Sequence, residues 1–125
     1  MSKSISEVSS LNSILTSIKK MLGIDEEYDC FDTDIILHIN SVFMILTQLG
    51  VGPSEGFTIS DKTTTWDEFL QDTKKLESVR SYVYLKVKLL FDPPLSSAVM
   101  DATNRLISEL EWRLNVAGEE ENQNE

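Results

Sequence analysis

Apolar residues recur at the three-to-four-residue spacing of an α-helix in four segments of this chain of 125 residues. Residues at that spacing lie on one face of a helix, so each segment predicts a helix with a buried side. A capping box, in which the Thr65 hydroxyl and the Glu68 carboxylate satisfy free backbone N–H groups, predicts a short fifth helix. The predicted fold class is all-α, a small bundle of four main helices plus one short helix. The predicted helices cover residues 12–22, 32–49, 66–71, 74–91 and 96–115.

The longest segment without helical period, residues 50–64, is predicted to be a long loop between the second and third main helices. Loops of this kind are often functional, and we expect this one to be mobile in the isolated chain and ordered only in an assembly. Within it, residues 57–59 could pair as a very short strand. The candidate functional residues of this loop are Gly52, Pro53, Gly56, Phe57 and Ile59.

Chain length and helix-ending residues predict one domain. A chain of 125 residues is too short for two full cores. Pro93 and Pro94 end the third main helix, because proline cannot continue the hydrogen-bond ladder. The predicted organisation is a flexible N-terminus at residues 1–10, a single helical domain at residues 11–116 and a disordered acidic tail at residues 117–125.

The charge of the chain argues against nucleic-acid recognition. There are 21 acidic and 11 basic residues, which gives a net charge of -10 at pH 7. Such a surface repels phosphate, so sequence-specific DNA binding is disfavoured. No apolar run approaches the roughly 18 residues of a membrane span, and the N-terminus lacks the apolar run of a signal peptide. A single cysteine excludes an intrachain disulfide and is typical of a reducing compartment.

No catalytic, cofactor or metal site is predicted. The alternating acids at residues 25–29 suggest a calcium loop, but Cys30 and Ile36 stand where an EF-hand needs glycine and glutamate. Cys30 and His38 are the only cysteine and histidine, and no orienting motif accompanies them. We therefore expect no enzyme activity, with a thiol or metal-dependent enzyme as a distant third hypothesis.

Several large apolar side chains lie away from the main apolar stripe of their helix. On the last helix, Val99 and Leu106 belong to the stripe expected to face the core, whereas Trp112 lies opposite. Exposed aromatic and aliphatic side chains mark protein interfaces, although some of these residues could instead fill the second side of a central helix. The candidate interface residues are Leu37, Met44, Tyr82, Leu85, Leu89 and Trp112.

Seven features follow one another along residues 11–116: the strings FDTDII and HIN from Phe31 to Asn40, GVGP from Gly50, the Trp66 helix, YVYLKV from Tyr82, LFDPP from Leu90 and EWRLN from Glu111. In order and spacing, this pattern resembles the head-tail connector proteins of tailed bacteriophages, also called head-completion or adaptor proteins. It is similar to the small helical connector of phages with HK97-type heads. The acidic tail lies outside the pattern.

The resemblance implies a structural virion protein without a cofactor. It implies an oligomeric ring, commonly dodecameric, that docks under the portal protein after DNA packaging and meets a tail-side connector or stopper protein. The DNA would pass through the ring without sequence-specific binding and without membrane contact. An acidic channel fits this role, since repulsion lets the duplex slide. The implied location is the head-tail interface of the virion, after assembly in the host cytoplasm.

A second hypothesis comes from another class of protein. The chain could be a small cytosolic acidic helical regulator that binds one host or phage protein. A regulator is expected to be a monomer or dimer, whereas a connector is expected to form rings, either alone or on docking to the portal.

Overall fold

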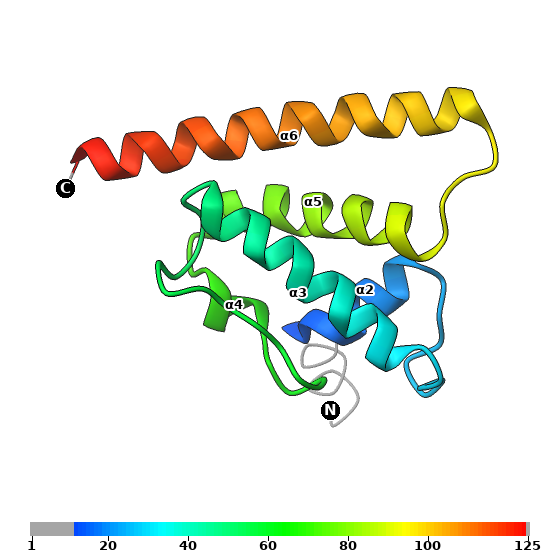
Figure 1. The fold of residues 1–125 in the computed structure, drawn as a ribbon. Coiled ribbons are helices and arrows are strands. Elements are labelled where there is room, and N and C mark those ends of the chain that lie inside the picture. Colours follow the sequence, from blue (N-terminus) through cyan, green and yellow to red (C-terminus); the bar gives the residue numbers. More distant parts are fainter. Residues whose placement is uncertain (1–11, 125) are drawn as a thin grey trace.

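The computed structural model of the protein describes the backbone of residues 12–124 and the side chains of residues 12–116. This part of the chain is helical and contains no strand, which confirms the all-α class. Figure 1 shows α5 between α6 on one side and α3 on the other, with α2 and α4 on the side away from α6. The helices are α2 (Ile14–Met21), α3 (Asp32–Gln48), α4 (Trp66–Phe69), α5 (Thr73–Phe91) and α6 (Ser97–Asn124).

The hydrophobic core follows the apolar periodicity of the sequence. The face of α3 that was predicted to be buried packs against α5, while α2 and α4 close the core from the side. The core side chains of α3 and α5 are Ile35, Ile39, Val42, Phe43, Leu46, Val79, Tyr82, Val83 and Val87.

None of the helices in the described range is long and apolar enough to cross a membrane.

The start of α2 is joined to the end of the long loop. Ser13 caps α2 and donates a hydrogen bond from Oγ to the carbonyl of Lys62 at 2.7 Å. The N–H of Ile14 donates to the carbonyl of Thr64 at 3.1 Å. The one short strand that the sequence suggested, at residues 57–59, does not form, because the backbone of Ile59 bonds to the side chain of Asn40 instead of to another strand.

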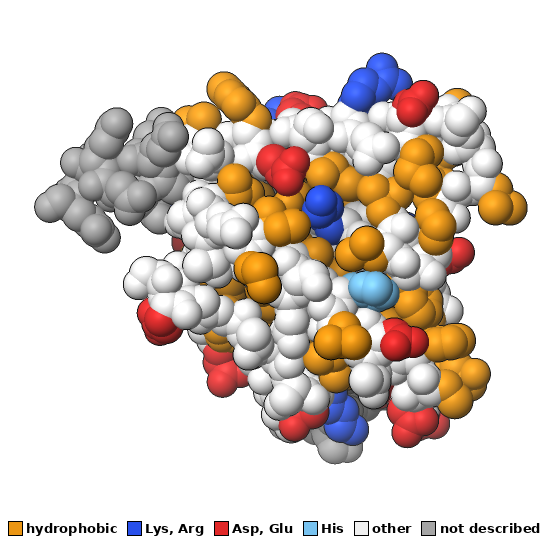
Figure 2. All heavy atoms as spheres, viewed as in Figure 1, with side chains coloured by type: hydrophobic (Ala, Val, Ile, Leu, Met, Phe, Trp, Pro, Cys, Tyr) orange, Lys and Arg blue, Asp and Glu red, His pale blue; other side chains and the backbone are white. Residues whose placement is uncertain are grey.

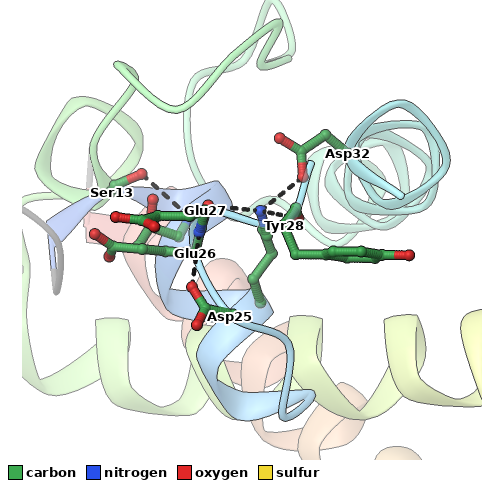
Figure 3. Close-up of polar contacts among 8 residues, drawn as sticks. Ser13, Asp25, Glu26, Glu27, Tyr28 and Asp32 are labelled. Carbon is green, nitrogen blue, oxygen red and sulfur yellow. Dashed lines mark hydrogen bonds and ion pairs between the residues drawn. The ribbon is translucent and has the colours of Figure 1, made fainter. Parts of the chain in front are cut away.

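A buried lysine, Lys19, fixes the connection between α2 and α3. Figure 3 labels the three residues that accept from its ammonium, Glu26, Tyr28 and Asp32. Lys19 is only 2% exposed, and its ammonium donates to the carbonyls of Glu26 and Tyr28 at 3.0 and 2.8 Å. It also forms an ion pair with Asp32 at 2.8 Å, in the first turn of α3. Three acceptors therefore surround the three donors of this ammonium, which is the condition for burying a charge without a large desolvation cost.

Helix α5 is apolar on more than one side because it packs against α3 and α6 and also contacts α2. Tyr82 is fully buried, and its hydroxyl donates to Oε2 of Glu111 on α6 at 2.7 Å. This residue therefore belongs to the core, and its expected place on an exposed interface is wrong. Leu85 and Leu89 are half-buried against the same core. The apolar second side of α5 is explained mainly by packing within the chain.

The Tyr82 hydroxyl makes folding sensitive to alkaline pH. Burial, together with the neighbouring Glu111 carboxylate, raises the pKa of Tyr82 above its ordinary value. Above about pH 10 the unfolded chain releases this proton while the folded chain keeps it, so the free energy of unfolding falls as pH rises. The part of this decrease that comes from Tyr82 is at most about 1.4 kcal/mol per pH unit, and we expect it to be absent from the Tyr82→Phe variant. Urea unfolding of both proteins from pH 8 to 11 measures it. Parallel pH dependences would contradict the prediction.

Helix α6 differs from the sequence prediction in length and in its buried face. It continues to Asn124, beyond the predicted end near residue 115. The backbone of residues 117–124 is therefore helical, where the sequence predicted a disordered tail. Glutamate and alanine favour helix there, and the single Gly118 costs only about 1 kcal/mol. The expected flexible N-terminus, residues 1–10, lies outside the described residues.

Val99 and Leu106 are exposed, although the sequence pattern placed them on the buried face. Helix α6 packs chiefly against one helix, α5, so only a narrow stripe of its surface is covered. That stripe consists of Ile107, Leu110 and Leu114, and the two exposed residues lie at its edge.

Candidate functional site

The outer face of α3 and residues 55–58 of the long loop form an open groove, here called the α3 groove. Its volume is about 590 Å³. Helical spacing brings Leu37, Met44 and the polar residues between and after them to one side of α3, opposite the core. The lining consists of Leu37, Asn40, Ser41, Met44, Thr47, Gln48, Glu55, Gly56, Phe57 and Thr58.

The wall of this groove is fixed to α3 by a side-chain amide. Asn40 donates from Nδ2 to the carbonyl of Ile59 at 2.9 Å and accepts at Oδ1 from the Ile59 N–H at 2.8 Å. Ile59 itself is buried in the core. Asn40 was not among the candidate functional residues predicted from the sequence. Its signal was a polar residue directly beside the buried stripe of a helix, between Ile39 and Phe43.

Aromatic packing holds the other end of the loop. The ring of Phe57 lies 5.3 Å from that of Phe43 and 5.1 Å from that of Phe69. Gly52 has φ +84°, and a Cβ there would clash with the ring of Phe69, so only glycine fits this approach. Gly52, Phe57 and Ile59 thus hold the loop against the core. The loop does not need an assembly to find packing partners, which differs from the mobility expected of it.

The candidate interface residues separate into two groups. Leu37, Met44 and Trp112 are 61%, 65% and 67% exposed. The three on α5, described above, are buried or half-buried. Figure 2 shows hydrophobic side chains on the viewed face along α3 and along the line where α6 meets α5. The exposed members of the candidate interface therefore lie on α3 and α6. Other exposed apolar side chains are scattered outside these two helices, at Met21, Tyr28, Phe31, Leu90 and Leu95.

Trp112 lies on the outer side of α6, nearly opposite Leu110 and Leu114. The other tryptophan, Trp66, does not cover it with the short helix α4. Trp66 is buried, and its Nε1–H donates to Oγ of Ser17 at 2.8 Å. The surroundings of Trp112 on its own helix are polar and include an ion pair between Arg113 and Glu109 at 2.6 Å.

Cys30 and His38 do not form a chemical pair in the structure. Cys30 is exposed in the loop before α3, where a hydrogen bond with it raises the pKa of the Tyr28 hydroxyl. His38 lies half-buried on α3. Among the residues that the structure describes, no group of three or more His, Cys, Asp or Glu side chains could hold a metal ion.

These features define a class of protein, an all-α module that presents exposed apolar surfaces on two helices and is typical of protein-binding domains. The chain belongs to a family within that class: the family model described as phage connector protein matches residues 14–121. The match runs from α2 into the last part of α6 and confirms the resemblance found in the sequence. The comparison with curated proteins gives no match, and the comparison with solved structures gives none.

Membership of this family makes the protein a structural component of the phage virion at the junction of head and tail. It assembles there with other head or tail proteins.

Proposed function

We propose that this chain is the subunit of a closed ring that docks under the portal protein after DNA packaging and extends the DNA channel toward the tail. The ring is dodecameric and meets a tail-side connector or stopper protein on its other side. It assembles in the host cytoplasm. The observation that carries the proposal is the family match over residues 14–121, which includes all of α2, α3, α4 and α5.

The exposed apolar surfaces support a ring. Closure by rotation requires heterologous contacts, in which one patch on a subunit meets a different patch on its neighbour. The α3 groove and the outer side of α6 are two such patches, and α5 separates their helices (Figure 1). A protein that binds one partner as a regulator needs only one of them.

The charge of the chain supports a role around DNA without recognition of its sequence. With a net charge of -10, a ring of these subunits surrounds the duplex with like charge. Repulsion from the phosphates lets DNA slide, whereas a basic lumen would hold it through released counterions. The role is structural and needs no enzymatic step, cofactor or metal.

Electron microscopy and mass measurement in solution test the proposed function. The purified protein is imaged alone and after mixing with heads that contain portal protein, with portal-free heads as the control. We expect rings, either free or bound only at the portal vertex. A protein that stays a monomer or dimer and never occupies the portal vertex would contradict the proposal and favour the regulator.

A further inference from the structure

We propose that Trp112 on α6 of one subunit inserts into the α3 groove of a second copy of this chain. The inference rests on the proposed ring and names the two surfaces that meet in it. Both surfaces are exposed in the single chain: one is a groove and the other carries a large aromatic side chain that could occupy it.

The α3 groove is suited to receive a large aromatic side chain. Its volume of about 590 Å³ exceeds what one ring needs, since a cavity of about 150 Å³ already holds benzene. Leu37 and Met44 offer apolar contact from α3, and Phe57 offers an aromatic ring from the loop. The methionine side chain adapts to irregular shapes and makes favourable contacts with aromatic rings. The two hydrogen bonds between the Asn40 side chain and the Ile59 backbone hold the loop side of the groove in place, so the groove exists before a partner binds.

Trp112 is suited to be the inserted group. Its side chain is 67% exposed and is carried by a continuous helix, so its backbone needs no rearrangement on binding. Tryptophan is among the residues that most often dominate binding energy when they enter a pocket. The residue cannot fill the groove of its own chain, because α6 packs chiefly against the α5 side of the bundle and α3 lies beyond α5 (Figure 1).

Charge complementarity favours a second copy as the occupant. Two chains with a net charge of -10 repel each other, so a contact between them must bring cations of one to acids of the other. Arg105 lies seven residues before Trp112, two helical turns along the same side of α6. Glu55 lines the α3 groove. Neither Arg105 nor Glu55 forms an ion pair with any of the residues described. On the donor surface Glu109 is already paired with Arg113, which leaves Arg105 to meet Glu55 of the acceptor groove.

Two variants and their mixture test this contact. Trp112→Ala removes the inserted group and keeps the groove, whereas Met44→Glu spoils the groove and keeps Trp112. We expect each variant alone to lose ring assembly, with association weakened about 30-fold or more. Mixed together, they retain one working contact per pair, so sedimentation velocity is expected to show two-chain species and no rings.

Fluorescence gives a second readout of the same mixture. Trp112→Ala retains only the buried Trp66, so the iodide-accessible emission of the mixture comes from Trp112 of the Met44→Glu chain. Adding the Trp112→Ala protein is expected to shift that emission to shorter wavelength and to reduce iodide quenching. Leu95→Ser is the control, because Leu95 is a fully exposed apolar residue outside both surfaces. It is expected to assemble as the wild type does. Circular dichroism verifies that all variants are folded.

The failures of this inference and of the proposed function are distinguishable. Suppose first that the wild type forms rings. The Trp112 contact is then wrong, while the ring stands, if either variant alone still forms rings. The same conclusion follows if the mixture of variants forms no two-chain species, or if it forms complete rings. Variants that form rings in solution but no longer attach to heads would assign the surface to another virion protein and overturn the second copy as its occupant. If the wild type forms no ring either alone or on portal-containing heads, the proposed function fails with it.

Discussion

Trp66→Ala is expected to lower the free energy of unfolding by about 4 kcal/mol. The Trp66 side chain is 1% exposed and lies where α4 closes the core between α2 and α3. Its ring stands edge-on to Phe43, with centroids 6.3 Å apart, and the guanidinium of Arg80 lies 5.9 Å from its centroid. Truncation removes these contacts, leaves a cavity and deprives the Ser17 hydroxyl of its indole donor.

Urea unfolding monitored by circular dichroism measures this loss, and the other tryptophan provides the matched control. Trp112→Ala is expected to change the free energy of unfolding of the single chain by less than about 0.5 kcal/mol, because its side chain is mostly in water. Trp66→Phe, which keeps a ring but removes the donor to Ser17, is expected to fall between the two. Equal destabilisation by the two alanine variants would contradict the assigned roles of the tryptophans.

Lys19→Met is expected to lower the free energy of unfolding by about 3 kcal/mol. The substitution keeps an unbranched side chain of similar length, so packing is largely preserved and the effect reports the ammonium. Without it, the carbonyls of Glu26 and Tyr28 lose a donor and the Asp32 carboxylate loses its cation. Asp32 is 29% exposed and can recover part of its hydration, which places the expected effect toward the lower end for a broken buried ion pair.

The neighbouring lysine gives the control for this second prediction. Lys20 is exposed one position further along α2, and Lys20→Met is expected to change stability by less than about 0.5 kcal/mol. Hydrogen exchange should also show faster exchange at residues 24–32 in Lys19→Met, since that connection loses its shared donor. A Lys19→Met protein as stable as Lys20→Met would show that the three contacts contribute little.

The helices could be predicted because their signals are local. The stripe from Ile35 to Leu46 on α3 needs only the helical period to be recognised, and the Thr65 and Glu68 capping box marks the start of α4 within four residues. The family resemblance had the same basis, since it followed the order and spacing of short strings along one chain. The family match over residues 14–121 confirms it.

The arrangement of the long loop could not be predicted, because it depends on contacts between residues far apart in sequence. The bonds from Asn40 to Ile59 and the approach of Gly52 to the Phe69 ring have no periodic signature. The absence of helical period assigned Phe57 and Ile59 to a loop that was expected to become ordered only in an assembly, whereas long-range packing places them on the core.

The candidate interface was only partly predictable, for a related reason. A helical period shows which residues lie off the main stripe, but it does not show how many neighbours a helix has. Helix α5 lies between α3 and α6 and also contacts α2, so Tyr82 is buried, whereas α6 packs chiefly against α5 alone, so Val99 and Leu106 stay in water. Leu37, Met44 and Trp112 were placed correctly in solvent because no second helix covers their side.

Because α6 packs chiefly against α5, it could detach from the rest of the protein by itself. A segment can detach alone when detaching it breaks one interface, and the cost rises with each further interface that must break. Helix α6 is held by its stripe on α5 and by the hydroxyl of Tyr82, and it follows a turn with two prolines, whereas α3 contacts α2, α5 and the long loop. We therefore expect α6 to open without unfolding of the other helices. Any contact made by the outer side of α6 opposes that opening and converts a separable segment into part of a larger cooperative unit.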